Sequence, residues 1–427
     1  MAIPRRRFLS MTGGVAATAL GLSACGGNTG RPDPASSASG SAGPKPELSS
    51  WFHQYGEEGT TQALERYAAA YEPATVKVKV NPSDYDKIVS AALLTDQRPD
   101  VFEYANGATL DMIKAGQVVD LTDTLGDAAA QFSKPVLDAV SWQDKIYAIP
   151  QIVDMQMLYY RKSVLDKAGI APPTTMDELI AAAKAVTTKD RGGFFAGNDS
   201  GVGVLTQLLI WSAGQELINA DGTGIGFDND AGYQALAQFA ALKNSGGLLE
   251  SASADWFASA PFTNEETVMQ WGGLWVLPEV QQALGDDFGV VPFPAIGAAG
   301  RQAVPFGAFS SVVAAQGVDP DAAKAYVKWL WVDQEADQVD FANAYGTHIP
   351  AKPALFAQAD KIATGAGADA AKFVNELGHA PDKLWTTAIS NAAVAAVTNV
   401  ITKKADPKSE IAKVAAKAKS EIQRVNG

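Results

Sequence analysis

Two kinds of segment alternate along this chain. In one kind the apolar residues recur at every second position, as in a strand, and in the other they recur about every 3.6 positions, as in a helix. Residues 47–53 predict an extended strand, residues 61–71 predict a helix with one apolar face, and residues 76–80 alternate again as a strand. The same succession continues with predicted helices over 85–94 and 110–114 and predicted strands over 100–103, 145–150 and 157–160. Such a succession favours an α/β fold, in which helices pack on mostly parallel sheets.

Two local motifs indicate where later helices begin. Thr175 and Glu178 have the spacing of a capping box and predict a helix start. The Asp-Pro pair at 319–320 predicts another, and the helix that follows is expected to turn Trp329 and Trp331 toward a core.

The length of the chain favours two lobes. About 380 residues follow Pro46, which is more than one ordinary core holds, and no internal repeat is visible. Cys25 is the only cysteine, so no disulfide bond forms within the chain and the fold depends on packing.

The N-terminus carries two export signals. Three arginines at 5–7 precede Phe8-Leu9 and an uncharged run too short to span a bilayer, which resembles a twin-arginine signal peptide. Leu22-Ser23-Ala24-Cys25 resembles a bacterial lipobox. We therefore expect a signal peptide over 1–24, cleavage before Cys25 and lipid on its thiol. The alternative is a chance apolar helix with an unmodified thiol.

The segment after the predicted cleavage site is unsuited to folding. Residues 25–45 contain no large apolar side chain, which predicts a lipidated flexible tether. No later apolar run is long enough to span a membrane, so the expected attachment is the lipid, on the outer face of the cell membrane. Without residues 1–24 the chain has 31 basic and 47 acidic residues, a net charge of −16, which argues against a nucleic-acid partner.

The order of several short motifs along nearly the whole chain resembles one family, the extracellular solute-binding proteins of ABC importers that capture sugars, such as maltose-binding proteins. The motifs are Trp51-Phe52-His53, RPDVF at 98–102, KIYAIP at 145–150, LYYRK at 158–162, AGIAPPTT at 168–175 and MQWGGLW at 269–275.

The resemblance implies a two-lobed periplasmic-binding-protein fold of type II, with ligand in the cleft and hinge closure over it. Crossovers between the lobes are expected near Ile152, Pro305 and Ile349. The implied lobes are 46–151 plus 306–350 at the N-terminal side and 152–305 plus 351–427 at the C-terminal side. The implied partners are ABC permease subunits and a separate ATPase, since the sequence has no P-loop. A monomer that is not an enzyme and needs no cofactor is expected.

A sugar site needs flat aromatic rings for the C–H face of a pyranose and polar groups for its hydroxyls. Among the tryptophans, Trp275 matches a position where the resembled family often stacks a ring on sugar, and Trp271 lies beside two glycines that permit close approach. We expect one of these two to line the cleft. The candidate ligand-binding residues are His53, Gln54, Tyr55, Glu103, Tyr104, Asp154, Trp211, Trp271, Trp275, Phe306 and Trp385.

Several candidates have a structural alternative. Trp211 lies in an apolar stretch and could be core, Glu103 could be a solvated strand-end charge, and Asp154 could cap a hinge. Phe306 and Phe309 either form the floor of the site or pack in the hinge.

Two other functions remain open from the sequence. A secreted glycoside hydrolase would need two carboxylates flanking one bond, for which Glu103, Asp154 and Asp255 are candidates. The same fold could instead bind a polyamine, an amino acid or ferric iron, and Tyr159-Tyr160 could serve iron. The number of tryptophans favours a sugar, and several candidate rings favour a di- or trisaccharide.

Metal binding is not expected. The three histidines, His53, His348 and His379, show no paired metal spacing. Residues 219–230 have some features of a calcium loop, but Gly226 stands where such loops have an aliphatic residue. A glycine-rich hairpin turn is the preferred interpretation.

Overall fold

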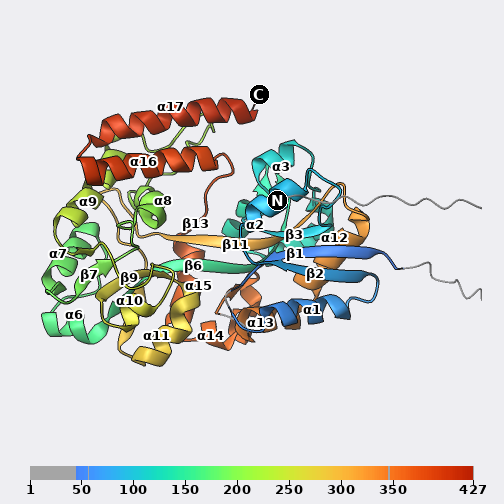
Figure 1. Ribbon diagram of the computed structural model, residues 1–427, viewed down its shortest axis with the longest axis horizontal. Helices are drawn as coiled ribbons and strands as arrows, with labels where there is room; N and C mark the ends of the chain where they lie inside the picture. The colour runs from blue at the N-terminus through green and yellow to red at the C-terminus, as the bar shows by residue number, and fades with distance from the viewer. Residues whose placement is uncertain (1–44, 56, 345–346, 427) are drawn as a thin grey trace, which may run out of the picture. The chain divides into compact units, whose positions relative to one another are not determined.

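A computed structural model of the chain describes residues 45–55, 57–344 and 347–426 (Figure 1). The predicted signal peptide, Cys25 and nearly all of the predicted tether lie outside the described residues. The strands are β1 (Glu47–His53), β2 (Thr75–Asn81), β3 (Val101–Ala105), β4 (Ser141–Trp142), β5 (Lys145–Ile146), β6 (Ile149–Arg161), β7 (Gly192–Phe195), β8 (Leu248–Leu249), β9 (Thr267–Gly273), β10 (Phe288–Val291), β11 (Val304–Val313), β12 (Ile349–Pro350) and β13 (Gly378–His379).

The α-helices are α1 (Thr60–Ala70), α2 (Tyr85–Ala92), α3 (Leu110–Lys114), α4 (Thr122–Leu125), α5 (Lys134–Val140), α6 (Lys162–Ala168), α7 (Met176–Val186), α8 (Val202–Ser212), α9 (Asp230–Asn244), α10 (Ala260–Thr263), α11 (Leu277–Leu284), α12 (Pro320–Lys328), α13 (Glu335–Ala344), α14 (Asp360–Ala363), α15 (Gly365–Leu377), α16 (Thr387–Lys403) and α17 (Pro407–Asn426). None of the helices in the described ranges is long and apolar enough to cross a membrane.

Two groups of parallel strands are joined by two long antiparallel strands. The strand order is β2-β1-β3-β11-β6-β9-β7-β8, in which β2, β1 and β3 are parallel to one another, as are β9, β7 and β8. The first half of β6 pairs with β11 and β12, whereas its second half pairs with β9 and β10. The expected α/β alternation is therefore confirmed, and β6 runs through both groups.

Helices cover both faces of each group (Figure 1). Leu48 and Phe52 of β1 pack against α1, α12 and α13, while Trp51 and Phe102 face α2 on the opposite side. A third core surrounds β7 and β9 and includes α7, α8, α9, α16 and α17. A fourth lies where β6 and β11 meet α11 and α15. The apolar periods seen in the sequence thus mark real buried faces.

The prediction of two separate strands over 145–150 and 157–160 was wrong. Residues 145–146 form the hairpin strand β5, and a single 13-residue strand begins at Ile149. Phe309 of β11 pairs with Ile152 and Ser310 pairs with Pro150, so Gln151 is the extra residue of a β-bulge. Proline has no N–H for the ladder, which explains why the bulge lies beside it.

The predicted helix starts are confirmed. Thr175 and Glu178 form both hydrogen bonds of a capping box at the start of α7. The Asp319 side chain accepts a hydrogen bond from Ala322 N (3.0 Å) at the start of α12. This helix ends in a π-helical turn at Trp329–Asp333, where Trp331 is buried as predicted and Trp329 is partly buried against Tyr71.

The preferred interpretation of residues 219–230 as a hairpin turn is also confirmed. Ile218 and Ile225 form an antiparallel bridge, and the backbone N–H of Asn219 donates to Gly224 O (2.9 Å). The Asn219 side chain accepts hydrogen bonds from Thr223 N and Gly224 N, so its oxygen stabilises the turn.

Candidate ligand-binding site

A cavity of about 690 Å³ lies where β6 and β11 pass between the two groups of strands. Its wall is formed by the loop after β1, the middle of β6, α8, the turn after β9, the first half of β11 and the segments before β12 and α16. The residues that line it are His53, Gln54, Tyr55, Glu57, Asn106, Asp154, Met155, Gln156, Gln207, Trp211, Phe257, Trp275, Pro305, Phe306, Gly307, Phe309, His348 and Pro381.

One buried carboxylate supports the β1 side of this cavity. Glu103 of β3 is 1% exposed and accepts hydrogen bonds from Tyr55 Oη and from His53 Nδ1, the latter at 2.5 Å. The Gln151 amide, turned toward it by the bulge in β6, also donates to Glu103 in the orientation that satisfies all its partners (2.8 Å). Burial by itself would lower the pKa of His53, but the Glu103 carboxylate reverses this and raises that pKa.

A second imidazole, that of His348, lies beyond Tyr55, with ring centroids 6.0 Å apart. His348 Nδ1 is 2.7 Å from Asp154 Oδ1, and His348 Nε2 is 3.4 Å from Glu57 Oε1. Burial would lower the pKa of His348, yet Asp154 and Glu57 outweigh it and the pKa is raised. The imidazole and carboxylate groups of the cavity therefore hold one another in place. Because these side chains are already ordered, binding a polar ligand costs less conformational entropy.

The aromatic wall on the other side is centred on Trp275. Its indole Nε1–H donates to Phe257 O (2.9 Å), and its ring packs edge-on against Trp256. A Cβ atom added at Gly273 would lie 2.2 Å from the Trp275 ring, so only glycine at 273 lets the ring lie across the backbone. Phe309 of β11 adds an aromatic ring on the opposite side, that of His53, on which it stacks (centroids 4.7 Å apart).

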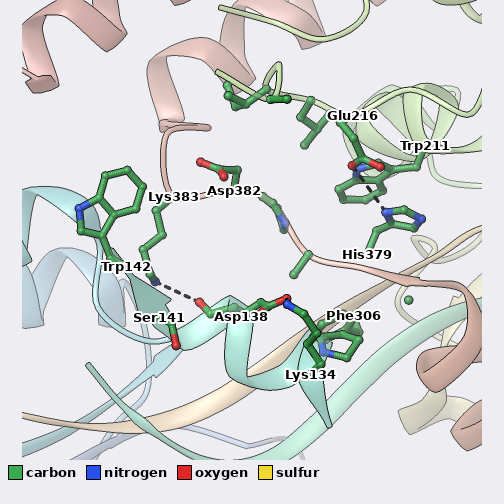
Figure 2. A pocket seen from close by; sticks show the side chains of 18 of the residues that line it. Lys134, Asp138, Ser141, Trp142, Trp211, Glu216, Phe306, His379, Asp382 and Lys383 are labelled. Atoms are coloured by element: carbon green, nitrogen blue, oxygen red, sulfur yellow. Dashed lines mark hydrogen bonds and ion pairs between the residues drawn. The ribbon is translucent and has the colours of Figure 1, made fainter. Parts of the chain in front are cut away.

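A second cavity of about 510 Å³ adjoins the first (Figure 2). The two share Trp211, Phe306 and Pro381 in their walls. His379 stacks on Trp211 with ring centroids 5.2 Å apart, and Trp142 lies across the cavity from it (Figure 2). The walls of both cavities contain aromatic and charged side chains.

Comparison with known proteins decides the family. The family model described as bacterial extracellular solute-binding protein matches residues 57–336, which is more than half of the chain. The chain belongs to this family. This solute-binding protein is 26% identical over 363 residues to the diacetylchitobiose-binding protein DasA of Streptomyces coelicolor, an alignment that covers 82% of the chain and 83% of the relative.

Solved structures show the same two-lobed fold. The GacH receptor of Streptomyces glaucescens, solved without ligand and with acarbose, matches with a TM-score of 0.74 and 21% identity over 89% of this chain and 99% of its own. The sugar-binding protein MalE of Xanthomonas citri matches with a TM-score of 0.75 and 17% identity over 89% and 98%. The predicted fold class and family are thereby confirmed.

The structure brings most of the predicted site residues together. The candidates in the wall of the main cavity are His53, Gln54, Tyr55, Asp154, Trp211, Trp275 and Phe306. Phe306 is 5% exposed and packs with Val304 and Ala308 in the core around β11, yet it also lines the main cavity, as does Phe309.

Four candidates lie elsewhere. Trp271 is fully buried on the same face of β9 as Met269, and its Nε1–H donates to the cavity residue Gln156 (2.8 Å). Trp385 is buried in the core of α8, α9, α16 and α17 and is not in the wall of the main cavity. Glu103 lies behind His53 and Tyr55, and Tyr104 lines two neighbouring cavities. Burial raises the pKa of Tyr104 to about 12.

Sequence reasoning missed several cavity residues. Gln156 follows Asp154 by two positions on β6, so strand period alone could have placed it on the same side. His348 directly precedes the third expected crossover, which was a usable signal. Asn106, Gln207 and Phe257 had no comparable local signal, because loops and a helix far apart in sequence bring them to the cavity.

Proposed function

We propose that this solute-binding protein captures a di- or oligosaccharide in the main cavity and delivers it to an ABC permease driven by a separate ATPase. The observation that carries the proposal is the composition of the cavity wall, which combines aromatic rings at Trp275 and Phe309 with hydrogen-bonding groups at His53, Asp154 and Gln156. Rings suit the C–H face of a pyranose, and groups that donate and accept suit its hydroxyls.

The second cavity supports a ligand of more than one unit. Because the two cavities share Trp211, Phe306 and Pro381, a chain of sugars in the first can continue into the second. The relatives point the same way, since DasA is described as binding diacetylchitobiose and GacH was solved with acarbose.

Lobe closure and membrane attachment complete the proposal. The proposed hinge comprises the crossings near Ile152, Pro305 and Ile349, which join lobes of 46–151 plus 306–350 and 152–305 plus 351–427. Export by the twin-arginine route and lipid on Cys25 are proposed from the sequence motifs alone. The folded part is proposed to act as a monomer.

The test is a thermal-shift panel followed by calorimetric titration. Mono-, di- and trisaccharides, a polyamine, an amino acid and ferric iron are each added to the purified folded part. A ligand that binds only the native state raises the melting temperature by mass action, and we expect this for a di- or trisaccharide. A shift with a non-sugar alone would overturn the proposal.

The same incubation addresses a hydrolase. The candidate carboxylates are engaged in hydrogen bonds: Glu103 with His53 and Tyr55, Asp154 with His348, and Asp255 with backbone N–H groups. Because the family of this chain binds solutes, we expect oligosaccharides to be recovered intact by chromatography. Turnover would count against the binding function.

A further inference from the structure

The segment between α15 and α16 lines both cavities and contacts strand β11 at one end and the core of α8, α9, α16 and α17 at the other. Its first residues, β13, pair with Val304 and Pro305 at the start of β11. Its last residues, Leu384 and Trp385, are buried in the core of α8, α9, α16 and α17. Between them, Pro381 lines both cavities.

One side chain of this segment reaches back to the N-terminal part of the chain. Lys383 Nζ donates hydrogen bonds to Asn106 O, Ala108 O and Ala139 O, each at 3.0 Å. An ammonium group has three hydrogens, and all three are used. Lys383 is visible beside the second cavity in Figure 2.

The three acceptors belong to one loop and to the end of one helix. Asn106 and Ala108 lie in the connection from β3 to α3, and Ala139 lies in the last turn of α5, where carbonyl groups have no partner within the helix and carry a partial negative charge. Asn106 has a positive φ of 57° and exchanges hydrogen bonds with Ala308, so this loop holds a defined conformation.

We propose that Lys383 is a positioning residue for the ligand cavity, because it ties the segment of Pro381 to the loop of Asn106 and so fixes two parts of the cavity wall relative to each other. The proposal rests on the proposed sugar-binding function and adds a residue that does not itself line the main cavity. Without the tie, both wall segments have more freedom, and this freedom must be lost again when ligand binds.

The surroundings of the Lys383 ammonium change its pKa, which can be measured. Burial lowers the pKa of Lys383 to about 8, and the neighbouring Asp382 opposes the change. Lys383 lines the second cavity and a third cavity bordered by the loop after β3 and by α3. Besides Asp382, the charged side chains and the histidine that line these two are Lys134, Asp138, Glu216, His379 and Asp111. Lys134 and Asp138 pair with each other at 2.5 Å, and Glu216 pairs with Arg301 at 2.6 Å.

The first test is hydrogen exchange on ligand-free protein. Lys383→Met keeps the length of the stem and removes all three donors, and Lys419→Met, an exposed position on α17, is the matched control for loss of one charge. We expect exchange to become about tenfold faster in peptides covering 105–110 and 378–386 of Lys383→Met alone. Exchange rates in both segments of Lys383→Met that equal those of the wild type would overturn the proposal.

The second test measures affinity for the oligosaccharide identified in the thermal-shift panel. We expect about tenfold weaker binding by Lys383→Met and unchanged binding by Lys419→Met. Faster exchange with unchanged affinity would show that the tie does not position the cavity. A wild-type protein that binds no sugar would count against the proposed function. Hydrogen exchange is measured without ligand, so it would still test whether the hydrogen bonds of Lys383 hold the two segments together.

The third test uses wild-type protein and so does not depend on the folding of a variant. In protein labelled with 13C-lysine, the 13Cε resonance of one lysine should titrate with a midpoint near pH 8. The same resonance should be missing from Lys383→Met. A Lys383 resonance that titrates like those of the exposed lysines would contradict the burial of this ammonium, whereas hydrogen exchange decides whether its three hydrogen bonds hold the two segments together.

Discussion

At the scale of single residues, the cavity owes its two chemical halves to one ring and one pair of imidazoles. Trp275 lies across Gly273 and is fixed by its hydrogen bond to Phe257 O, so its ring is in place before ligand arrives. His53 and His348 are held by Glu103 and Asp154. The aromatic ring and the imidazole pair can therefore be tested separately.

Trp275→Ala should weaken oligosaccharide binding about 10- to 100-fold, since loss of a buried aromatic contact costs about 1.5–3 kcal/mol. The measurement is calorimetric titration. The matched control is Trp329→Ala, whose ring packs against Tyr71 and Tyr326 outside the cavity and should affect stability alone. Equal loss of affinity in both variants would contradict a stacking role for Trp275.

Asp154→Asn should change how stability depends on pH. The pKa of His348 is raised in the folded state, so the folded protein binds more protons than the unfolded chain above pH 6.5. The stabilising contribution is complete below about pH 6.5 and is lost as pH rises through the raised pKa. Urea unfolding of ligand-free protein should therefore show a shallower fall of stability over this window in Asp154→Asn than in wild type.

An equal slope in the two proteins would show that Asp154 does not hold the proton on His348. The slope for one proton cannot exceed about 1.4 kcal/mol per pH unit, which gives the measurement a ceiling. His53 contributes in the same direction, mainly through Glu103 and to a smaller extent through Asp154, so the difference between the two proteins reports chiefly on His348.

Single residues also show which parts of the candidate site could be predicted from local sequence pattern. Trp271 and Trp275 are four positions apart, and the choice between them depended on where the strand ends. Because β9 continues to Gly273, Trp271 shares the buried face of Met269, and Trp275 lies beyond the strand in the following turn. The contact of Asp154 with His348 joins residues 194 positions apart, and no local pattern reveals it.

At the scale of elements, β6 and β11 decide the geometry of the cavity. Helix starts and strand periods were predictable because capping and burial are local, as Thr175 and the alternation in β2 show. The length of β6 was not, because its bulge at Gln151 depends on pairing with β11. The bulge also turns Gln151 toward Glu103, so it contributes to the site as well as to the sheet.

Gly307 of β11 offers a way to fill the cavity without disturbing the fold. It pairs with Asp154 and lines the main cavity, and a Cβ added there would meet no atom within 4 Å. Gly307→Phe should therefore fold with a melting temperature near that of wild type while losing oligosaccharide binding. Gly307→Ala, the size control, should keep both, with stability equal or up to about 1 kcal/mol higher.

Retained affinity in Gly307→Phe would place the ligand away from this stretch of β11. Circular dichroism melting and calorimetric titration on the same samples separate that outcome from misfolding, because a misfolded variant would lose its cooperative transition as well as its affinity.

At the scale of the whole molecule, binding and attachment are predicted to reside in different parts of the chain. The folded part is described from Lys45, whereas Cys25 and residues 26–44 lie before it. If residues 25–45 form the predicted flexible tether, a coil of about 20 residues has a root-mean-square reach of about 25 Å, enough to let the folded part stand clear of the lipid headgroups. Attachment would then raise the local concentration of the binding protein near its permease.

Cys25→Ala should consequently release the protein from membranes and leave sugar affinity unchanged. Fractionation of cells measures the release, and calorimetric titration of the purified variant measures affinity. Since one acyl chain gives only marginal membrane binding, full retention of the wild type would indicate more than one chain. Weaker sugar binding by Cys25→Ala would mean that the lipidated terminus acts on the cavity, and the separation of binding from attachment would be wrong.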